Sequence, residues 1–309
     1  MKIQNLVGMI VALIALATGT RLAAQDPRTG LLEADRAASR ASGDSGWYSM
    51  LAGRLDSAGV LLWPGAPVIV GREDVARWSA MLPGRDSIRL TWQPLDLALA
   101  RDSSLGIVWG VVGLTSRVAF LPAEFGRYMA VWRRDQNRWV LQAILFSGVK
   151  PPARTSPPGL PAIRPPFTPS GVEARFVAAD LAFSRLAGDS GAAVAFRRWA
   201  APEAIVFGEH GLLTRGPGAI GRGVAGAARW RWHPVAAGAS RAGDLGWTVG
   251  EAVISPPEGD PIYSKYLTVW VQPSDGPPRF LTDGGNLRPA GAATIPAPRP
   301  RGSARKSRR

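Results

Sequence analysis

The sequence contains an internal repeat, so the chain must fold into one kind of domain that is built twice. Five short motifs of the first half recur in the same order in the second half, at offsets of 138 to 145 residues. The offset changes only between motifs, as expected when loops vary in length and structural elements persist. The matching segments are Ala34-Asp35 with Ala179-Asp180, Gly43–Gly46 with Gly188–Gly191, Trp92-x-Pro94 with Trp232-x-Pro234, Leu105-Gly106 with Leu245-Gly246, and Tyr128-x-x-Val131-Trp132 with Tyr266-x-x-Val269-Trp270.

A proline-rich segment separates the two copies. Eight of the 27 prolines lie between residues 151 and 169, and such a segment favours an extended, semi-rigid spacer over a helix or a strand. We therefore predict copy one at residues 29–148, a linker at 149–171 and copy two at 172–288. Domains of roughly 120 residues are long enough to bury a core of their own.

The two ends of the chain differ from the copies in composition. Residues 1–24 combine an early lysine, an uncharged apolar run and small residues at the end, which is the pattern of a secretory signal peptide. We predict cleavage near Ala24 and export to the periplasm or the medium. An uncleaved anchor is the alternative, although the run is shorter than the roughly 20 apolar residues of a spanning helix. Residues 289–309 are predicted to form a disordered basic tail.

Composition excludes several kinds of site. The chain has no cysteine, which excludes disulfides, thiol catalysis, cysteine-ligated zinc and lipidation of a leader cysteine. The net charge is +14, but eight of the excess positive charges lie in the signal peptide and the last eleven residues. The copies contain no basic stripe, so we predict no specific binding of nucleic acid. The tail could contact anionic surfaces through charge alone, or serve only as a solvated extension.

The hydrophobic periodicity predicts an α+β fold for each copy. In copy one, two helical patterns, a hairpin and a third helical pattern come first, and four strands follow. This order indicates about three helices packed on one face of a curved, mainly antiparallel sheet. Copy two repeats it. The predicted elements of copy one are helices at 30–42, 47–55 and 72–82, hairpin strands at 60–63 and 67–70, and sheet strands at 89–100 (with a slip in the alternation at Pro94), 105–116, 127–133 and 138–146.

Several motifs occupy matching places on these predicted elements. They are Ala34–Ala37 and Ala179–Phe183 on the first helix, Gly71 and Gly216 before the third, the Trp-x-Pro and Tyr-x-x-Val-Trp segments, Gly243–Gly250 and Asp283–Gly285. Together they resemble the nuclear transport factor 2-like superfamily, which includes ketosteroid isomerase and SnoaL-like cyclases, and most closely its secreted branch of domains of unknown function. The resemblance implies two tandem cone-shaped domains, each with a pocket between sheet and helices, which pair through their sheets as an intramolecular pseudo-dimer. Copy one departs from the pattern at Ser103-Ser104, where copy two has Gly243-Asp244.

Asp180 and Asp35, aligned on the first helix of each copy, are candidate catalytic residues. Asp180 shares its helical face with Phe176 and Phe183, and a carboxylate facing a core is costly unless it is protonated or hydrogen-bonded. One interpretation is a general base with a raised pKa. The alternative is a buried anchor that accepts hydrogen bonds from an indole, a tyrosine hydroxyl or a backbone amide.

The other polar candidates carry less information. His233 replaces Gln93 of copy one, so histidine chemistry would be confined to copy two, and a pocket or surface position is the alternative. His210 is expected in a solvated turn, so the two histidines lie in unlike settings. We therefore predict no metal site. Gly216–Gly221 fits a dinucleotide fingerprint, but no βαβ unit surrounds it, so no cofactor is predicted. The aspartates expected in turns are Asp44, Asp189, Asp244 and Asp283, of which the last two could rim a pocket.

Aromatic side chains on the predicted sheet strands are the candidate ligand-binding residues. Rings on the concave face of a cone would line an apolar pocket with a few polar groups. Core packing is the alternative for each ring. The eight rings are Trp92, Trp109, Tyr128 and Trp132 in copy one and Trp232, Trp247, Tyr266 and Trp270 in copy two.

Two functions of different classes fit these observations. The first is a non-catalytic exported module that binds a small apolar ligand or a protein partner through its pockets. The second is a small-molecule isomerase, cyclase or dehydratase that uses Asp180 with His233 nearby. We favour the first, because only copy two offers a histidine to complete an acid–base pair.

Overall fold

The structure is a computed structural model, and it describes residues 26–82, 84–116, 123–149, 167–208 and 211–290. The predicted signal peptide, most of the linker and most of the basic tail lie outside these residues, as does His210. None of the helices in the described ranges is both long enough and apolar enough to cross a membrane.

The two copies contain the same helices and sheet strands in the same order, which confirms the predicted α+β class. Copy one comprises α1 (Pro27–Ser45), α2 (Trp47–Arg54), β1 (Leu55–Leu62), β2 (Ile69–Val70), α3 (Arg72–Met81), a short 3-10 turn η1 (Arg85–Ser87), β3 (Ile88–Leu99), β4 (Leu105–Ser116), β5 (Glu124–Asp135) and β6 (Arg138–Ser147). Copy two comprises α4 (Ala174–Ser190), α5 (Ala192–Trp199), β7 (Ala200–Phe207), β8 (Leu213–Arg215), α6 (Pro217–Gly223), β9 (Arg229–Ala239), β10 (Leu245–Ser255), β11 (Ile262–Val271) and β12 (Arg279–Leu287).

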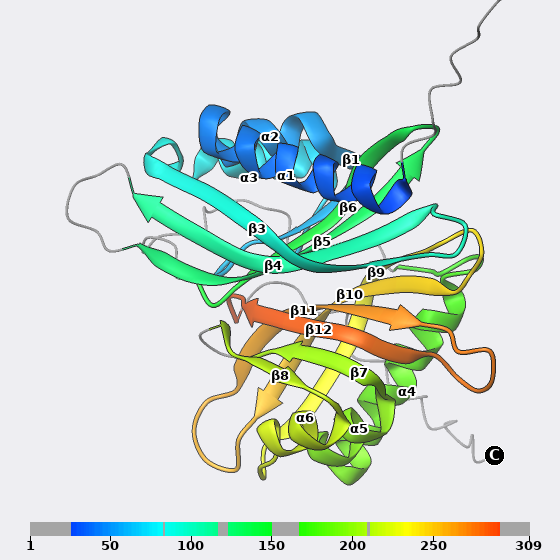
Figure 1. Cartoon of the computed structure of the whole chain (residues 1–309). Coiled ribbons are helices and arrows are strands. Elements are labelled where there is room, and N and C mark those ends of the chain that lie inside the picture. The colour runs from blue at the N-terminus through cyan, green and yellow to red at the C-terminus, as the bar shows by residue number, and fades with distance from the viewer. Residues whose placement is uncertain (1–25, 83, 117–122, 150–166, 209–210, 291–309) are drawn as a thin grey trace, which may run out of the picture.

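Each copy builds one six-stranded, curved sheet with its helices on one face (Figure 1). The strand orders are β2-β1-β6-β5-β4-β3 and β8-β7-β12-β11-β10-β9. All neighbours are antiparallel except β1 with β6 and β7 with β12, so the sheets are mixed. The slip expected at Pro94 is a β-bulge, because the β3–β4 register shifts between Pro94 and Asp96.

The first helix of each copy is longer than its glycines predict. Gly43 and Gly46 are expected to break this helix, yet α1 continues through Gly43 and Asp44, and Asp189 is helical in the same way. The helices end at Gly46 and Gly191, whose φ angles of 90° and 88° cost glycine little because it has no Cβ. Asp44 and Asp189 lie at the end of the first helix, as predicted, but they are helical and do not form a turn of their own.

Three hydrophobic clusters hold the molecule together. The first lies between the helices and the sheet of copy one, and the second lies at the same place in copy two. The third, the inter-sheet cluster, takes side chains from the outer faces of both sheets, which face each other in Figure 1. Because strand side chains alternate between faces, most of these central strands are apolar on both sides. The inter-sheet cluster includes Val60, Leu62, Ile107, Trp109, Met129 and Val131 of copy one with Ile205, Phe207, Leu245, Trp247, Val249 and Leu267 of copy two.

Hydrogen bonds between the copies repeat at aligned positions. The Arg101 backbone N–H donates to Asp244 Oδ2 at 2.8 Å, and the Arg241 backbone N–H donates to Ser104 Oγ at 2.9 Å. Arg101 aligns with Arg241, and Ser104 aligns with Asp244, so the two contacts are related by an approximate two-fold axis. Asp244 lies in the turn between β9 and β10, where the sequence places it.

Candidate functional site

In copy one, Asp35 is a fully buried acceptor for three side-chain donors. Its carboxylate accepts hydrogen bonds from Trp92 Nε1 at 3.1 Å, Tyr128 Oη at 2.7 Å and Trp132 Nε1 at 3.2 Å. Burial raises the pKa of Asp35 from 3.8 to about 6, while the three donors act in the opposite direction. This geometry matches the buried-anchor interpretation, because α1 is tied through one carboxylate to β3 and β5.

In copy two, Asp180 makes a related network with a different third partner. Its carboxylate accepts from Trp232 Nε1 and from Tyr266 Oη, both at 2.8 Å. The third indole, Trp270 Nε1, donates to Thr248 Oγ1 at 2.9 Å, and the Thr248 hydroxyl in turn hydrogen-bonds Asp180. Burial raises the pKa of Asp180 to about 6. Five of the eight predicted aromatic residues therefore surround an aspartate, and Trp270 lies beside the second one.

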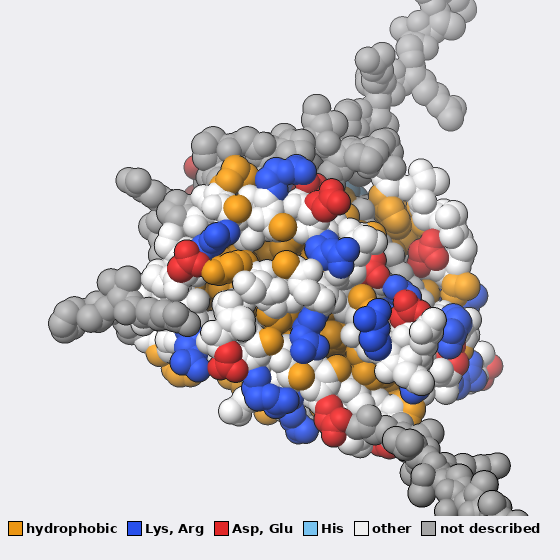
Figure 2. All heavy atoms as spheres, turned by 90° about the horizontal axis from the view of Figure 1, so that it is seen from above, with side chains coloured by type: hydrophobic (Ala, Val, Ile, Leu, Met, Phe, Trp, Pro, Cys, Tyr) orange, Lys and Arg blue, Asp and Glu red, His pale blue; other side chains and the backbone are white. Residues whose placement is uncertain are grey.

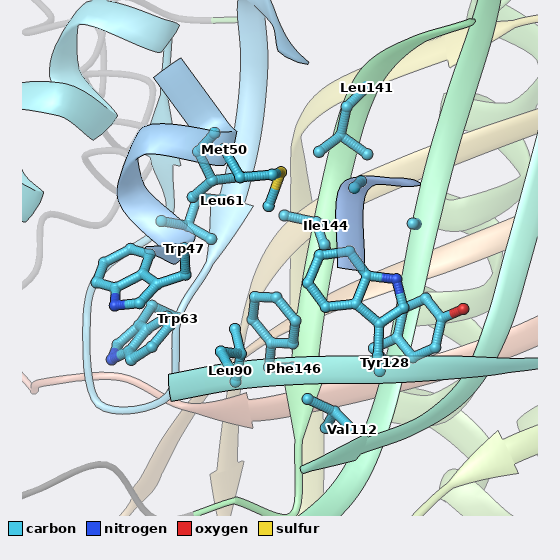
Figure 3. Packing of buried hydrophobic residues seen from close by; sticks show 14 of the residues in the cluster. Trp47, Met50, Leu61, Trp63, Leu90, Val112, Tyr128, Leu141, Ile144 and Phe146 are labelled. Atoms are coloured by element: carbon cyan, nitrogen blue, oxygen red, sulfur yellow. The ribbon is translucent and has the colours of Figure 1, made fainter. Parts of the chain in front are cut away.

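The interior of copy one is filled by a four-ring cluster, defined as Trp47, Trp63, Trp78 and Phe146. Each of these rings is at most 1 % exposed. Trp47 stacks on Trp63 with ring centroids 4.4 Å apart, and Phe146 meets Trp63 edge-on at 5.9 Å. Figure 3 shows three of the rings with Tyr128 and the aliphatic side chains around them. No large pocket for a ligand is expected in so filled a core.

Copy two has a small residue at every position of the four-ring cluster. The aligned residues are Ala192 for Trp47, Gly208 for Trp63, Gly223 for Trp78 and Gly285 for Phe146. Its own aromatic cluster has moved elsewhere, to Phe183, Phe196 and Phe280 around Trp232. Bulk is therefore missing from one end of the copy-two interior. We call the region beside Tyr266, Gly208 and Gly285 the copy-two interior site.

Asp283 lies at this site, although the sequence places it in a turn. It belongs to β12 and aligns with the fully buried Ile144 of copy one. Its register partner is Thr268, whose hydroxyl donates to it, so both face the helices together with Tyr266 two residues away. Asp283 is only partly buried, and Tyr266 is 8 % exposed where Tyr128 is 0 % exposed. Solvent thus reaches the interior of copy two at a place that is closed in copy one.

Two neighbouring carboxylates give this site its electrostatic character. Burial raises the pKa of Asp283 from 3.8 to about 7, and the charge of Asp180 raises it further, while the Thr268 hydroxyl acts against both effects. Burial also raises the pKa of Tyr266 well above 10, with the Asp180 charge adding to it. Near neutral pH the site therefore offers a carboxyl group that is protonated for part of the time. A protonated carboxyl can donate a hydrogen bond, which a carboxylate cannot do.

The pKa of Asp283 predicts a pH dependence of stability. Between about pH 4 and pH 7 the folded protein holds a proton on Asp283 that the unfolded chain has lost, so this group contributes less stability as the pH rises through that range. The Asp283→Asn variant carries an amide there, which does not titrate. We expect the free energy of unfolding of the variant, relative to the wild type, to increase from pH 4.5 to pH 7.5 in urea titrations. Differences that stay constant across this range would contradict the raised pKa.

The other predicted site residues lie away from the copy-two interior. Trp109 and Trp247 belong to the inter-sheet cluster. His233 follows Trp232 on β9, and because the Trp232 indole points at Asp180, His233 faces the opposite side of the sheet. Asp180 and His233 therefore do not meet in one site. Gly216–Gly221 forms the start of the short helix α6, which follows β8. Among the described residues, no cluster of side chains could ligate a metal ion.

Comparison with solved structures returns proteins of the superfamily that the motifs resemble. No protein-family model and no curated protein matches the sequence. A ketosteroid isomerase-like protein from Erwinia carotovora atroseptica SCRI1043 is 14% identical, with 38% of this chain and 94% of that chain covered and a TM-score of 0.31. A nuclear transport factor 2-like protein of unknown function from Shewanella oneidensis MR-1 is 16% identical, with 40% and 99% covered and a TM-score of 0.32. A nuclear transport factor 2-like protein with a cystatin-like fold from Novosphingobium aromaticivorans is 14% identical, with 37% and 80% covered and a TM-score of 0.32.

Each of these matches covers about two-fifths of the chain, which is the size of one copy. These solved structures are nuclear transport factor 2-like and ketosteroid isomerase-like proteins, the kind of protein that the motifs resemble. The fold itself rests on the strand order and helix positions described above. At these identities the likeness carries nothing about activity.

Proposed function

We propose that this protein binds a small, largely apolar ligand in the copy-two interior site, and that copy one serves as its structural partner. The observation that carries the proposal is the replacement of the four-ring cluster by Ala192, Gly208, Gly223 and Gly285 at the place where Asp283 reaches solvent. An empty space in a hydrophobic core lowers stability. A core region that lacks large side chains therefore indicates a site for another molecule.

The residues around the site indicate the chemistry of the ligand. Val206, the register partner of Asp283 on β7, belongs to the hydrophobic cluster of copy two and supplies an apolar wall. Asp283 and Tyr266 are the polar groups, and each can donate to or accept from an oxygen atom. We therefore expect a compact ligand with one carbonyl or hydroxyl group and no net charge, since the carboxyl groups would repel an anion.

The same proposal includes the arrangement of the copies and their compartment. The inter-sheet cluster and the paired hydrogen bonds at Arg101 and Arg241 support an intramolecular pseudo-dimer that needs no second chain. The pattern of residues 1–24 supports export after cleavage near Ala24.

Native mass spectrometry of the protein purified from the cell envelope tests all three parts. We expect a monomer that lacks residues 1–24 and carries a reproducible small-molecule adduct. A dimer would contradict the intramolecular pairing, and the full-length mass would contradict cleavage. A monomer without any adduct, even after incubation with an extract of small apolar metabolites, would contradict the binding function.

Filling the site should abolish binding. A Cβ at Gly208 would meet only Leu212 O, at 3.8 Å, so the position has room for a side chain, and Trp63 occupies the aligned position in copy one. We expect Gly208→Trp to weaken retention of the adduct at least tenfold, while circular dichroism shows an unchanged fold. Gly208→Ala is the matched control, because a methyl group leaves most of the space open. Full binding by Gly208→Trp would place the ligand elsewhere.

One observation favours a second function, an isomerase, cyclase or dehydratase. Asp180 and Asp283 are neighbouring carboxyls with pKa values raised to about 6 and about 7, and such a pair can exchange a proton with a ligand near neutral pH. His233 has no part in this version, since it faces the other side of the sheet. An enzyme would release a ligand of altered structure, and Asp283→Asn would retain the unaltered one. Recovery of the same compound from both proteins would support binding alone.

A further inference from the structure

A second region of copy one has the features of a binding site, and it lies apart from the copy-two interior. A groove of about 690 Å³ follows β3, the edge strand of the first sheet. Residues of α1, β3, β4 and β5 line it. We call it the arginine groove, after Arg36, Arg40 and Arg89.

The arginine groove carries a net positive charge, because three arginines and one aspartate line it. All three arginines are exposed. Nowhere in the described ranges does an acidic side chain come within 4.0 Å of their charged nitrogen atoms. Asp44 is the one acidic residue among those that line the groove. Three guanidinium groups around one open space provide flat hydrogen-bond donors that suit carboxylate, sulfonate or phosphate oxygens.

The groove also has apolar walls. Phe125 is 66 % exposed, and its ring lies over Gly113, 3.5 Å from the place where a Cβ would stand. Pro94 of β3 contributes further apolar surface. An aromatic ring next to guanidinium groups favours a ligand that combines an anionic group with a flat or aliphatic body.

We propose that the arginine groove binds a free, small organic anion with an apolar body. The volume is within the range of ligand sites, roughly 300–1,000 Å³. The anionic group would pair with Arg40 and Arg89, and the body would pack on Phe125. Figure 2, which views the helical side of copy one, shows Lys and Arg side chains beside exposed hydrophobic atoms on this face.

Copy two offers a matched control at aligned positions. Arg185 aligns with Arg40 and Arg229 aligns with Arg89, so the same two charges can be removed from either copy. Leu181 replaces Arg36, Arg231 replaces Thr91, and Glu251 replaces Val111 of the groove lining. Copy two therefore has the same number of arginines and one carboxylate more at the aligned place, so it should bind an anion less well.

The test uses 8-anilinonaphthalene-1-sulfonate as the anionic probe and N-phenyl-1-naphthylamine, which lacks the sulfonate, as its neutral analogue. Fluorescence titrations of the full mature chain give the dissociation constants. We expect Arg40→Gln/Arg89→Gln to weaken binding of the sulfonate about tenfold or more, and Arg185→Gln/Arg229→Gln to leave it unchanged. Both double variants remove the same net charge, so general attraction of anions cancels. Binding of the neutral analogue should be the same in both.

Phe125→Ala provides a second variant, since this exposed ring is not needed for folding. It should weaken binding of the sulfonate without any change of net charge. Equal weakening by the two arginine double variants, or none by the copy-one variant, would overturn the proposal. Gly208→Trp should leave this binding intact, so failure here and failure of the copy-two site are separate results.

Discussion

Replacing Trp63 with alanine is expected to lower the free energy of unfolding by about 3–5 kcal/mol, the range for truncating a large aromatic residue in a core. Trp63 is 1 % exposed, and its ring lies against three others. These neighbours are themselves large and rigid, so the space left behind cannot close by small shifts. Urea unfolding, with hydrogen exchange to locate the change in copy one, measures the effect.

The aligned position of copy two supplies the control for this prediction. Gly208→Ala adds a methyl group, and Trp63→Ala removes all of the side chain except a methyl group. Both variants therefore have alanine at the aligned position. We expect Gly208→Ala to change the free energy of unfolding by no more than about 1 kcal/mol, and in the stabilising direction, because alanine restricts the unfolded chain. A loss below about 1 kcal/mol for Trp63→Ala would mean that the four-ring cluster is not a packed core.

Removing the Asp35 carboxylate is expected to cost about as much. Asp35→Ala would leave two indole N–H groups and one tyrosine hydroxyl buried without their acceptor. A buried donor that loses its partner costs about 1–3 kcal/mol, and costs in one network do not simply add, so we expect a loss of about 3–5 kcal/mol. The variant should also lose the near-ultraviolet circular dichroism of the fixed Trp92 and Trp132 rings.

Asp44→Ala, on the same helix, is the matched control for Asp35→Ala. Asp44 is exposed and makes no hydrogen bond to the aromatic residues, so its removal should change stability by less than about 0.5 kcal/mol. If Asp35→Ala were as mild as Asp44→Ala, the carboxylate would not be an anchor. A pocket role with a functional cost would then be the better interpretation of Asp35.

The two copies thus use the same scaffold in different ways. In copy one, Asp35 accepts hydrogen bonds from three side chains, and large rings fill the interior. These are features of a structural domain. Copy two directs one indole to Thr248, replaces four rings by small residues and adds Asp283. The difference is concentrated at aligned positions, so single substitutions in one copy can be judged against the other.

Some features of the site were within reach of the sequence and were missed. Asp283 and Gly285 align with Ile144 and Phe146, and this comparison between the copies would have marked both positions as unusual. The prediction that Asp283 lies in a turn was wrong. It was based on composition, because Asp-Gly-Gly usually forms a turn. Here the glycines sit in a strand: a Cβ at Gly285 would lie 2.7 Å from the Lys265 backbone oxygen.

The sequence by itself determined the duplication, the order of elements and the presence of an aspartate on the apolar face of each first helix. These conclusions depend on recurring motifs and on periodicities within single elements, which local steric preferences control. Only the tertiary structure decided which groups share a space. It placed Asp283 beside Thr268 and within electrostatic reach of Asp180, placed His233 on the other face, and brought Trp109 and Trp247 between the sheets. Strand register and the bulk of side chains from four separate elements set these relations, and neither is visible in any one stretch of the chain.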